Sequence, residues 1–555
     1  MFLRVVLLLV LVDRVAQAST IRALDGLGNA VAWWAVIKLP SHVQSPDGVV
    51  IPTPCDCPVP DCSNVATAGW SALEARAAGL CYLYADSRTP EFRHFRDVGY
   101  DCLGQGGNDP VSHTLKQKEN SSYWAIFNDQ LNGIASAFHP KETERLQYSK
   151  QVCGGGDLFS AHAKGAVAFQ SDASGGFFLQ TSTPNFPDPT RNDSFVKLGC
   201  QTDNNVHFSQ HMLAMSLEDN ELLQLGNKLQ LARLCSANFF LNESLHDFLG
   251  SATLFKDGAE QENTSASAFY HALLDQYLPV QLPSDPMKAE FSLKLATTQV
   301  EKSRVFEPLV KGQDLFDFDP IEGEQVRVLI KSPRAAVPPW TLVAEMLDSD
   351  VSVASWWDGN YGIPTICAGD VYTHSPNEFC LNNPRTGVEL NADGSAPYNI
   401  ENLMQATWHM SDGSSNLTWQ LVGGRVSDGN HAKWGLTTPR FGPVESANAY
   451  VTFGDLNMEG FPCSKACNGS QAGRGGSFFS LLYPRLHKSL ADSVISGACR
   501  CSPPAELQFL QNDTSLPTFE ELRMCHRGCV KKIEERLEPA QLPILSVNAS
   551  SFWSK

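Results

Sequence analysis

Short apolar runs, separated by polar, glycine-rich or proline-containing segments, dominate the hydrophobic pattern of the chain. Runs of this length that are rich in Val, Ile and aromatic residues are typical of buried strands. The run that begins at Ala30 closes on Pro40, and the two runs on either side of Gly175 flank a turn typical of a hairpin. We expect strands at residues 30–40, 123–127, 166–169, 177–181, 326–330, 418–422 and 449–453.

Helical periodicity occurs in fewer places. Leucines near helical spacing predict a helix within residues 218–234, and a capping box at 518–521 predicts another over 519–537. The polar segment 257–267 carries a glycosylation sequon and is expected to be a surface loop between two halves of the chain. The alternation of strands and helices favours an α/β (α+β) layered fold.

The first residues have the form of a secretory signal peptide. An early Arg4 precedes an apolar run at 5–12, and Ala16-Gln17-Ala18 has the small-x-small form that signal peptidase prefers. We therefore expect cleavage after Ala18. Later apolar runs fall short of the roughly 18 residues that a spanning helix needs, so no membrane anchor is expected.

The chain contains 16 cysteines, several of them in close pairs, which fits disulfide formation in an oxidising compartment. A proline-rich loop at 52–60, with cysteines at 55, 57 and 62, is expected to be pinned by disulfides, and the loop-like segment 356–383 with its two cysteines is also expected to be bridged. Some of the close pairs would suit zinc by spacing, but the oxidising route favours disulfides.

The last part of the chain, from about residue 486, changes character and is expected to form a disulfide-stapled appendage. Within its predicted helix Cys525 and Cys529 share a face, and Cys499 and Cys501 are plausible partners for them.

Sequons for N-linked glycans support the secretory route and predict a glycoprotein of the lysosome or the extracellular space. They lie at Asn120, Asn192, Asn242, Asn263, Asn416, Asn468, Asn512 and Asn548.

The formal net charge is −18, which would repel a nucleic acid at neutral pH. In an acidic organelle, below about pH 5, protonation of histidines and of some carboxylates removes much of this repulsion. A simpler interpretation is that the acidity only keeps an extracellular protein in solution.

The tripeptide H-x-K occurs three times. The occurrence at 139–141 precedes a charged surface pattern and is interpreted as coincidental. His162-Ala163-Lys164 and His431-Ala432-Lys433 each lead into an apolar strand and then reach an asparagine, Asn185 and Asn457 respectively. For a single H-x-K we would favour a structural histidine, but the recurrence of the whole pattern favours a paired site.

Two such units supply what phosphodiester cleavage without a metal or other cofactor requires. One imidazole can attack phosphorus to form a phosphohistidine, and a second, protonated imidazole can donate to the leaving oxygen. In an extended H-x-K the two side chains share a face, so Lys164 and Lys433 would clamp the phosphate. Asn185 and Asn457 would act as donors.

The residues around these motifs resemble the deoxyribonuclease II family, a branch of the phospholipase D superfamily. The similarity lies in scattered blocks at 31–40, 128–130, 184–187, 454–457 and 474–476. The resemblance implies two half-sites that meet across a pseudo-twofold axis, and DNA endonuclease activity at acid pH without divalent metal, leaving 3′-phosphate ends. The usual order in the superfamily would make the first histidine, His162, the nucleophile.

The resemblance also adds Asp455 and Arg474 as candidate substrate-binding residues, although Arg474 could instead cap a loop. The superfamily has an acidic residue five positions after the lysine, where this chain has Phe169 and Thr438; Asp172 and Asp455 lie nearby.

The predicted domains, in chain order, are a signal peptide (1–18), a first phospholipase D-like half (19–250), a second half (251–485) and the appendage (486–555).

Two other functions remain open. One is a phospholipase-like phosphodiesterase, and the other is a catalytically silent secreted glycoprotein that kept the fold as a binding module. The aromatic residues near the motifs, Trp434, Phe186 and Phe177, are expected to pack in the core and not to stack on bases.

Overall fold

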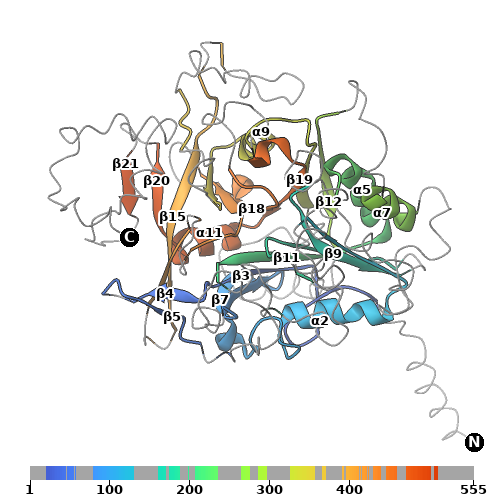
Figure 1. Ribbon diagram of the computed structural model, residues 1–555, viewed down its shortest axis with the longest axis horizontal. Coiled ribbons are helices and arrows are strands. Elements are labelled where there is room, and N and C mark those ends of the chain that lie inside the picture. Colours follow the sequence, from blue (N-terminus) through green and yellow to red (C-terminus); the bar gives the residue numbers. More distant parts are fainter. Residues whose placement is uncertain are drawn as a thin grey trace, which may run out of the picture.

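Two antiparallel-rich sheets form the body of the protein, seen in a computed structural model (Figure 1). The structure describes residues 20–45, 47–55, 57, 79–129, 161–170, 174–184, 186–187, 198, 207–234, 264–274, 286–296, 325–356, 365–369, 391–392, 395–411, 413, 416–421, 423, 429–438, 445–458, 470–501 and 506–509. The expected signal peptide, the tripeptide at 139–141 and the expected helix at 519–537 lie outside these residues.

The first sheet has seven strands, and all of its neighbouring pairs are antiparallel. Strand β3, with the sequence Trp-Trp-Ala-Val-Ile-Lys, lies inside this sheet and is buried on both faces, which explains its continuous apolar run. In spatial order the strands are β7 (Thr89–His94), β6 (Tyr82–Asp86), β3 (Trp33–Lys38), β11 (Gln210–Leu217), β10 (Gly176–Thr181), β9 (Lys164–Phe169) and β8 (Tyr123–Asn128). The strands and the hairpin expected in this half are thereby confirmed.

The second sheet has 12 strands, and β14 and β15 form its parallel pair. Its main path is β12 (Lys288–Lys294), β13 (Gln325–Lys331), β19 (Gly476–Leu482), β18 (Tyr450–Gly454), β17 (Trp434–Thr437), β14 (Val351–Ala354), β15 (Ile400–His409), β16 (Asn416–Gln420), β4 (His42–Gln44) and β5 (Val50–Pro52). Strands β20 (Ile495–Arg500) and β21 (Glu506–Phe509) extend it from β15, and a separate two-stranded sheet joins β1 (Ala23–Leu24) to β2 (Ala30–Val31). The expected strands at 326–330, 418–422 and 449–453 correspond to β13, β16 and β18.

Helices cover the sheets and their ends. Helices α2 and α9 lie on opposite sides of the pair of sheets, and α5 packs against α7 (Figure 1). The helices are α2 (Pro110–Lys116), α5 (Asp219–Leu229), α7 (Ser265–Leu274), α9 (Pro339–Leu347) and α11 (Pro484–Ser493), with short 3-10 turns at Phe95–Val98, Gln117–Asn120, Gln230–Ala232, Ser446–Asn448 and Ser470–Gly473. This is the mixed α/β layered fold that the sequence predicts. Among the described residues, no helix is long and apolar enough to cross a membrane.

Helix α5 confirms the helix expected within 218–234, but the loop expected at 257–267 is wrong in its last residues. Ser265 to Ser267 form the first turn of α7. Ser267 donates its backbone N–H to the Thr264 hydroxyl (3.1 Å) and accepts from the backbone N–H of Thr264 (3.2 Å), which caps the helix. The apolar face that follows packs against α5, and this burial stabilises a helix in a segment that looks polar.

The two sheets repeat one strand order. Strands β8-β9-β10-β11-β3-β6 of the first sheet correspond, neighbour by neighbour, to β14-β17-β18-β19-β13-β12 of the second. When Lys164 is aligned with Lys433, the registers also align Lys38 with Lys331 and Gly165 with Trp434. The chain therefore contains an internal duplication, and the two H-x-K motifs occupy equivalent positions in it.

The core is formed by the faces of both sheets and their helices. Trp434, Phe186 and Phe177 are at most 1% exposed, which confirms that they are core residues. The two described sequon asparagines, Asn120 and Asn416, are exposed, as glycan attachment would require.

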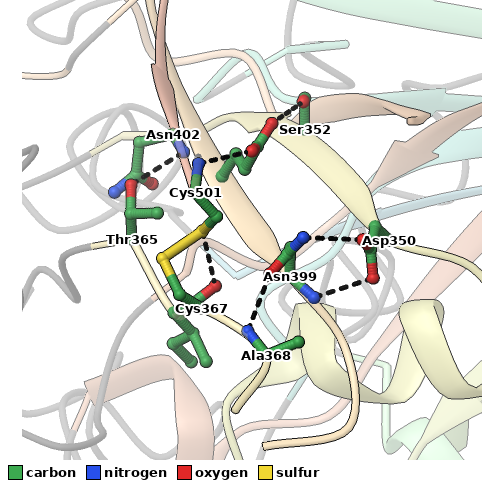
Figure 2. The surroundings of a disulfide bond; sticks show 10 residues. Asp350, Ser352, Thr365, Cys367, Ala368, Asn399, Asn402 and Cys501 are labelled. Carbon is green, nitrogen blue, oxygen red and sulfur yellow. Dashed lines mark hydrogen bonds between the residues drawn. A yellow bond between two sulfur atoms is a disulfide. The ribbon is translucent and has the colours of Figure 1, made fainter. Parts of the chain in front are cut away.

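Disulfides pin the segments that the cysteine pattern indicated, but one pairing differs from expectation. Cys55 pairs with Cys81 and Cys57 with Cys102, so the proline-rich loop is anchored to the first sheet. Cys501 pairs with Cys367, not with a tail cysteine (Figure 2). The reason is that β20 pairs with β15 and brings residue 501 to the segment around Ile366, which itself bridges to Ile400.

The boundary expected at residue 485 falls inside helix α11. This helix contacts β7, β18 and β20, and β20 joins the second sheet. The first residues beyond that boundary are thus built into the main fold.

Candidate active site

The two H-x-K motifs lie at equivalent ends of β9 and β17. Each lysine begins or directly precedes its strand, and each histidine lies two residues earlier. His162 and His431 are each 6% exposed, whereas Lys164 and Lys433 are at most 1% exposed. Both imidazoles are thus nearly buried, and the ammonium groups are fully buried.

His162 is held by residues of the second half of the chain. Its backbone N–H donates to the Gly475 carbonyl (2.9 Å), and its Nδ1 lies 2.9 Å from the Asp455 carbonyl oxygen. Because a carbonyl only accepts, Nδ1 carries the proton in this contact, and Nε2 is the nitrogen available for chemistry.

A buried ion network lies beside Nε2 of His162. The Lys164 ammonium donates to Oδ1 of Asp129 (2.7 Å), and Arg474 contacts Oδ2 of the same carboxylate (2.8 Å). Nε2 of His162 is 4.0 Å from Oδ2 of Asp129 and 3.5 Å from the Lys164 ammonium. Arg474 also donates to the Ala161 carbonyl (3.1 Å), so it connects the two halves at this point.

His431 is held in the same way by residues of the first half. Its backbone N–H donates to the Ser209 carbonyl (2.8 Å), and its Nδ1 lies 3.1 Å from the Ser182 carbonyl oxygen. The side-chain oxygen of Gln210 is 3.2 Å from the same Nδ1. The Lys433 ammonium is 3.1 Å from Nδ1 and donates to the carbonyl of His431 itself (2.8 Å).

These contacts follow the internal duplication. Under the strand alignment above, Ser182 is equivalent to Asp455 and Ser209 to Gly475. Each histidine is thus oriented by two backbone carbonyls of the opposite half, and these carbonyls occupy equivalent positions in the two halves. The two half-sites are therefore in direct contact, since each histidine is bonded to the opposite half.

Burial and neighbouring cations hold both histidines neutral near pH 7. Burial is the main cause of the lowered pKa of His162, followed by Lys164, while Asp129 acts in the opposite direction. Burial likewise lowers the pKa of His431, followed by Lys433 and Lys164. Because Lys433 also lowers the pKa of His162, the two half-sites interact electrostatically.

The two aspartates of the site are shifted in opposite directions. Burial by itself would raise the pKa of Asp129, but Lys164, His162 and Arg474 outweigh it and hold the pKa well below its ordinary range. Burial raises the pKa of Asp455 to about 6, against hydrogen bonds from Ser477 and Gln180.

The remaining predicted residues are placed as follows. Asp455 contributes its carbonyl to His162, while its carboxylate accepts from Ser477 N–H (2.8 Å) and Gln180 Nε2 (3.0 Å). Asn457 is buried two residues further on, and its backbone N–H donates to Gln471. Asn185 and Asp172 lie outside the described residues, and so does the H-x-K tripeptide at 139–141 that was interpreted as coincidental.

Several residues of the site were missed in the sequence. Asp129 directly follows β8, the strand that pairs with β9. In the sequence, only the Asn-Asp pair at the end of that strand pointed to it. Gln210 had no signal, although its side chain accepts from the Ser182 hydroxyl (2.6 Å) and lies against His431. Among the described residues, no group accepts from the amide nitrogen of Gln210.

A second pair of lysines, Lys38 and Lys331, occupies equivalent positions next to the site. Both are fully buried, and each donates to the carbonyl of the following residue (3.1 and 3.3 Å). Lys331 also donates to the Arg474 carbonyl (2.7 Å), which fixes the segment that carries Arg474 and Gly475. Burial lowers the pKa of each lysine to about 7.

In the described residues, one group of side chains has the spacing of a metal site, and it consists of Cys55, Cys57 and Cys81. All of these are disulfide-bonded, so their sulfur atoms are not thiolate ligands.

A duplicated α/β sheet that carries one His–Lys pair per half, with the pairs interlocked across the repeat, defines a two-half protein of the kind found in the phospholipase D superfamily. The family model for deoxyribonuclease II matches residues 70–497, so the chain belongs to the deoxyribonuclease II family. No curated protein matches the chain. Membership of this family implies a nuclease that hydrolyses DNA.

Proposed function

We propose that the protein is an acid, metal-independent endonuclease that cleaves DNA through a phosphohistidine and leaves 3′-phosphate ends. The observation that carries this proposal is the interlocked pair of half-sites, in which His162, Lys164, His431 and Lys433 supply two imidazoles and two cations to one place. The imidazoles provide a nucleophile and an acid, and the cations stabilise the charge that develops on the phosphoryl oxygens.

The electrostatics of the site support an acid optimum. One imidazole must carry a proton to protonate the leaving oxygen, and burial with nearby lysines lowers the pKa of both histidines. The protonated form is therefore populated only in acid, where protonation also reduces the repulsion between DNA and a chain of formal charge −18. An acidic lysosomal compartment or an acidified extracellular space would suit such an enzyme, and N-linked glycans are part of the same proposal.

Arg474, Asp455 and Asn457 are proposed as supporting residues around the phosphate. Arg474 is 24% exposed at its side chain and already holds Asp129, so it can face a phosphate while it keeps its position. Asp455 acts through the carbonyl that orients His162. Asn185 is proposed only from the resemblance.

The test is nicking of supercoiled plasmid at about pH 5 in excess chelator. The wild type should nick, and His162→Ala and His431→Ala should each lose at least about 100-fold in rate. The matched control is His487→Ala, because His487 is also buried but bonds to the Thr437 carbonyl within the second half. Absence of nicking by the wild type would refute the function, and unchanged nicking in both site variants would refute the assignment of residues.

A phospholipase-like phosphodiesterase is distinguished in the same series. Hydrolysis of a phosphatidylcholine vesicle without nicking of plasmid would favour that activity. Product ends complete the test: cleavage to 3′-phosphates leaves 5′-hydroxyls, which polynucleotide kinase labels without prior phosphatase treatment.

A further inference from the structure

The two half-sites are equivalent in backbone but differ in the side chain next to the lysine. Asn128 pairs with Lys164 across β8 and β9, which places Asp129 beside the Lys164 ammonium. The same register along β14 and β17 places Trp356 at the equivalent position of the second half. A carboxylate in one half-site is therefore replaced by an indole in the other.

The side chains that contact Asp129 and Trp356 also differ between the two half-sites. Asp129 pairs with Arg474, and the residue equivalent to Arg474 in the first half is Phe208. Phe208 contacts Trp356 edge to face, with ring centroids 5.0 Å apart. One half-site thus contains an ion pair where the other contains an aromatic pair.

This difference acts on the histidines directly. The Asp129 carboxylate is 4.0 Å from Nε2 of His162, whereas the Trp356 ring lies edge-on to His431 with centroids 4.9 Å apart. Within the described part of the chain, His431 forms no salt bridge to a carboxylate, and the Lys433 ammonium is 3.1 Å from its Nδ1. An imidazolium at His431 would face a cation and an aromatic ring, while one at His162 would have a carboxylate to stabilise it.

Lys164 and Lys433 act on both rings. Lys164, Lys433 and Arg474 disfavour a proton on His162, and Lys433, Lys164 and His162 disfavour one on His431. Among the described residues, the groups that raise the pKa differ: the Asp129 carboxylate acts on His162, and the Ser182 carbonyl acts on His431. Because a full negative charge stabilises an imidazolium more than a carbonyl dipole does, the carboxylate 4.0 Å from Nε2 favours the proton on His162.

We infer that the histidines have fixed and different roles: His431 attacks phosphorus, and His162, beside Asp129, protonates the leaving oxygen. This inference rests on the proposed phosphohistidine reaction and assigns its two steps. In the first, Nε2 of His431 forms a bond to phosphorus, the P–O5′ bond breaks, and the proton on Nε2 of His162 passes to O5′. In the second, His162 takes a proton from water, the oxygen of that water bonds to phosphorus, and the P–N bond to His431 breaks.

The assignment is opposite to the order usual in the superfamily, in which the first histidine would attack. Asp129 becomes a positioning residue in this scheme, because it acts on the proton of His162 and through the Lys164 and Arg474 contacts.

A substrate that needs no acid separates the two roles. In thymidine 3′-(p-nitrophenyl phosphate) the nitrophenolate takes the place of the 5′-oxygen and leaves without protonation. His162→Ala should release one equivalent of nitrophenolate per site in a burst and then stall, because His162 is also the base for the second step. His431→Ala should give no burst. The trapped, acid-labile phosphoryl group in the first variant should map to the peptide that contains residue 431.

A burst in His431→Ala alone, or equal behaviour of the two variants, would overturn the assignment. Glutamine variants of both histidines, checked for native near-UV circular dichroism, repeat the comparison with a less disruptive change. The nicking assay on the wild type distinguishes failure of this inference from failure of the proposed function. If the wild type nicks DNA but the burst appears in His431→Ala and not in His162→Ala, the proposed function stands and this inference fails.

Asp129→Asn gives an independent test. DNA cleavage, which needs the acid, should fall at least about 10-fold more than cleavage of the nitrophenyl ester, and its optimum should move to lower pH. The matched control is Asp350→Asn, which removes a buried carboxylate that holds Asn399 instead (Figure 2). If Asp129 had a purely structural role, its substitution would lower the rates of cleavage of both substrates equally. That result would overturn its assignment as a positioning residue.

Discussion

The buried carboxyl group of Asp455 should contribute more to stability in acid than at neutral pH. Its side chain is 3% exposed, and burial raises its pKa from the ordinary 3.8 to about 6. The folded state therefore binds this proton more tightly than the unfolded chain. Stability from this group is fully present below about pH 4 and is lost as the pH rises from about 4 to about 6. A difference of about 2 pKa units corresponds to about 3 kcal/mol at pH 7 and to about half of that at pH 5.

Asp455→Asn removes the ionisation with little change in shape. The new amide can donate to Gln180, because the side-chain oxygen of Gln180 has no hydrogen-bond partner among the described residues and its amide can turn over. Guanidinium unfolding of wild type and variant at pH 4, 5, 6 and 7 measures the difference in their unfolding free energies. Relative to the wild type, the variant should gain about 2 to 3 kcal/mol between pH 4 and pH 7.

The matched control is Asp109→Asn. Burial raises the pKa of Asp109 to about 6 as well, but this residue caps helix α2 through the Ser112 N–H (2.9 Å). The same pH dependence of stability is expected, since asparagine is also a good N-cap. The Asp109 variant should leave DNA cleavage unchanged. A stability difference that does not vary with pH in the Asp455 pair would refute the reasoning.

Three further changes test other parts of the structure. Lys331→Met removes an ammonium group whose pKa is lowered to about 7 by burial. Between pH 7 and pH 10.5 the unfolding free energy of the wild type should therefore rise by up to about 5 kcal/mol relative to the variant. Equal pH profiles of stability would contradict this. Gly165→Ala would place Cβ 2.0 Å from the Leu179 carbonyl oxygen and should destabilise by about 3 kcal/mol, lowering the thermal midpoint; an unchanged midpoint would contradict the packing argument. Replacing Cys367 and Cys501 together by alanine removes a disulfide that spans 134 residues of sequence. The unfolding free energy measured with denaturant should fall by roughly 3 to 5 kcal/mol. An unshifted midpoint would show that the disulfide does not reduce the conformational entropy of the unfolded chain.

The strands that the sequence reveals are those with uniform apolar faces. Strand β3 is recognisable because all of its residues are buried and nearly all are apolar. Strand β15 was missed because it contains Glu401 and Asn402, which no hydrophobic pattern assigns to an interior. Both are buried with specific partners: Glu401 accepts from Ser352 and from the Cys501 N–H, and Asn402 donates to Thr365 (Figure 2). Such burial is stable only after the partners from distant segments are in place.

The same reason limits prediction of the site. His162 and Lys164 are two residues apart, so their pairing is visible in the sequence, and the pair at His431 repeats it. The carbonyl groups of Asp455 and Ser182 that orient the rings are invisible, because every residue has a carbonyl and only the fold selects these two. Asp129 lies 35 residues before Lys164, and only the pairing of β8 with β9 brings them together.

The duplication shows how one backbone frame can give two histidines different surroundings. Two identical half-sites would give both histidines the same proton affinity, so a single proton would be shared equally between them. Cleavage needs one neutral and one protonated imidazole at once. The backbone frame stays symmetric, because each ring is held by carbonyls of the opposite half, but the side chains around it diverge: Asp129 stands against Trp356, and Gln210 against Gly476. The common frame brings the two histidines together, and the unequal neighbours assign the proton to one of them.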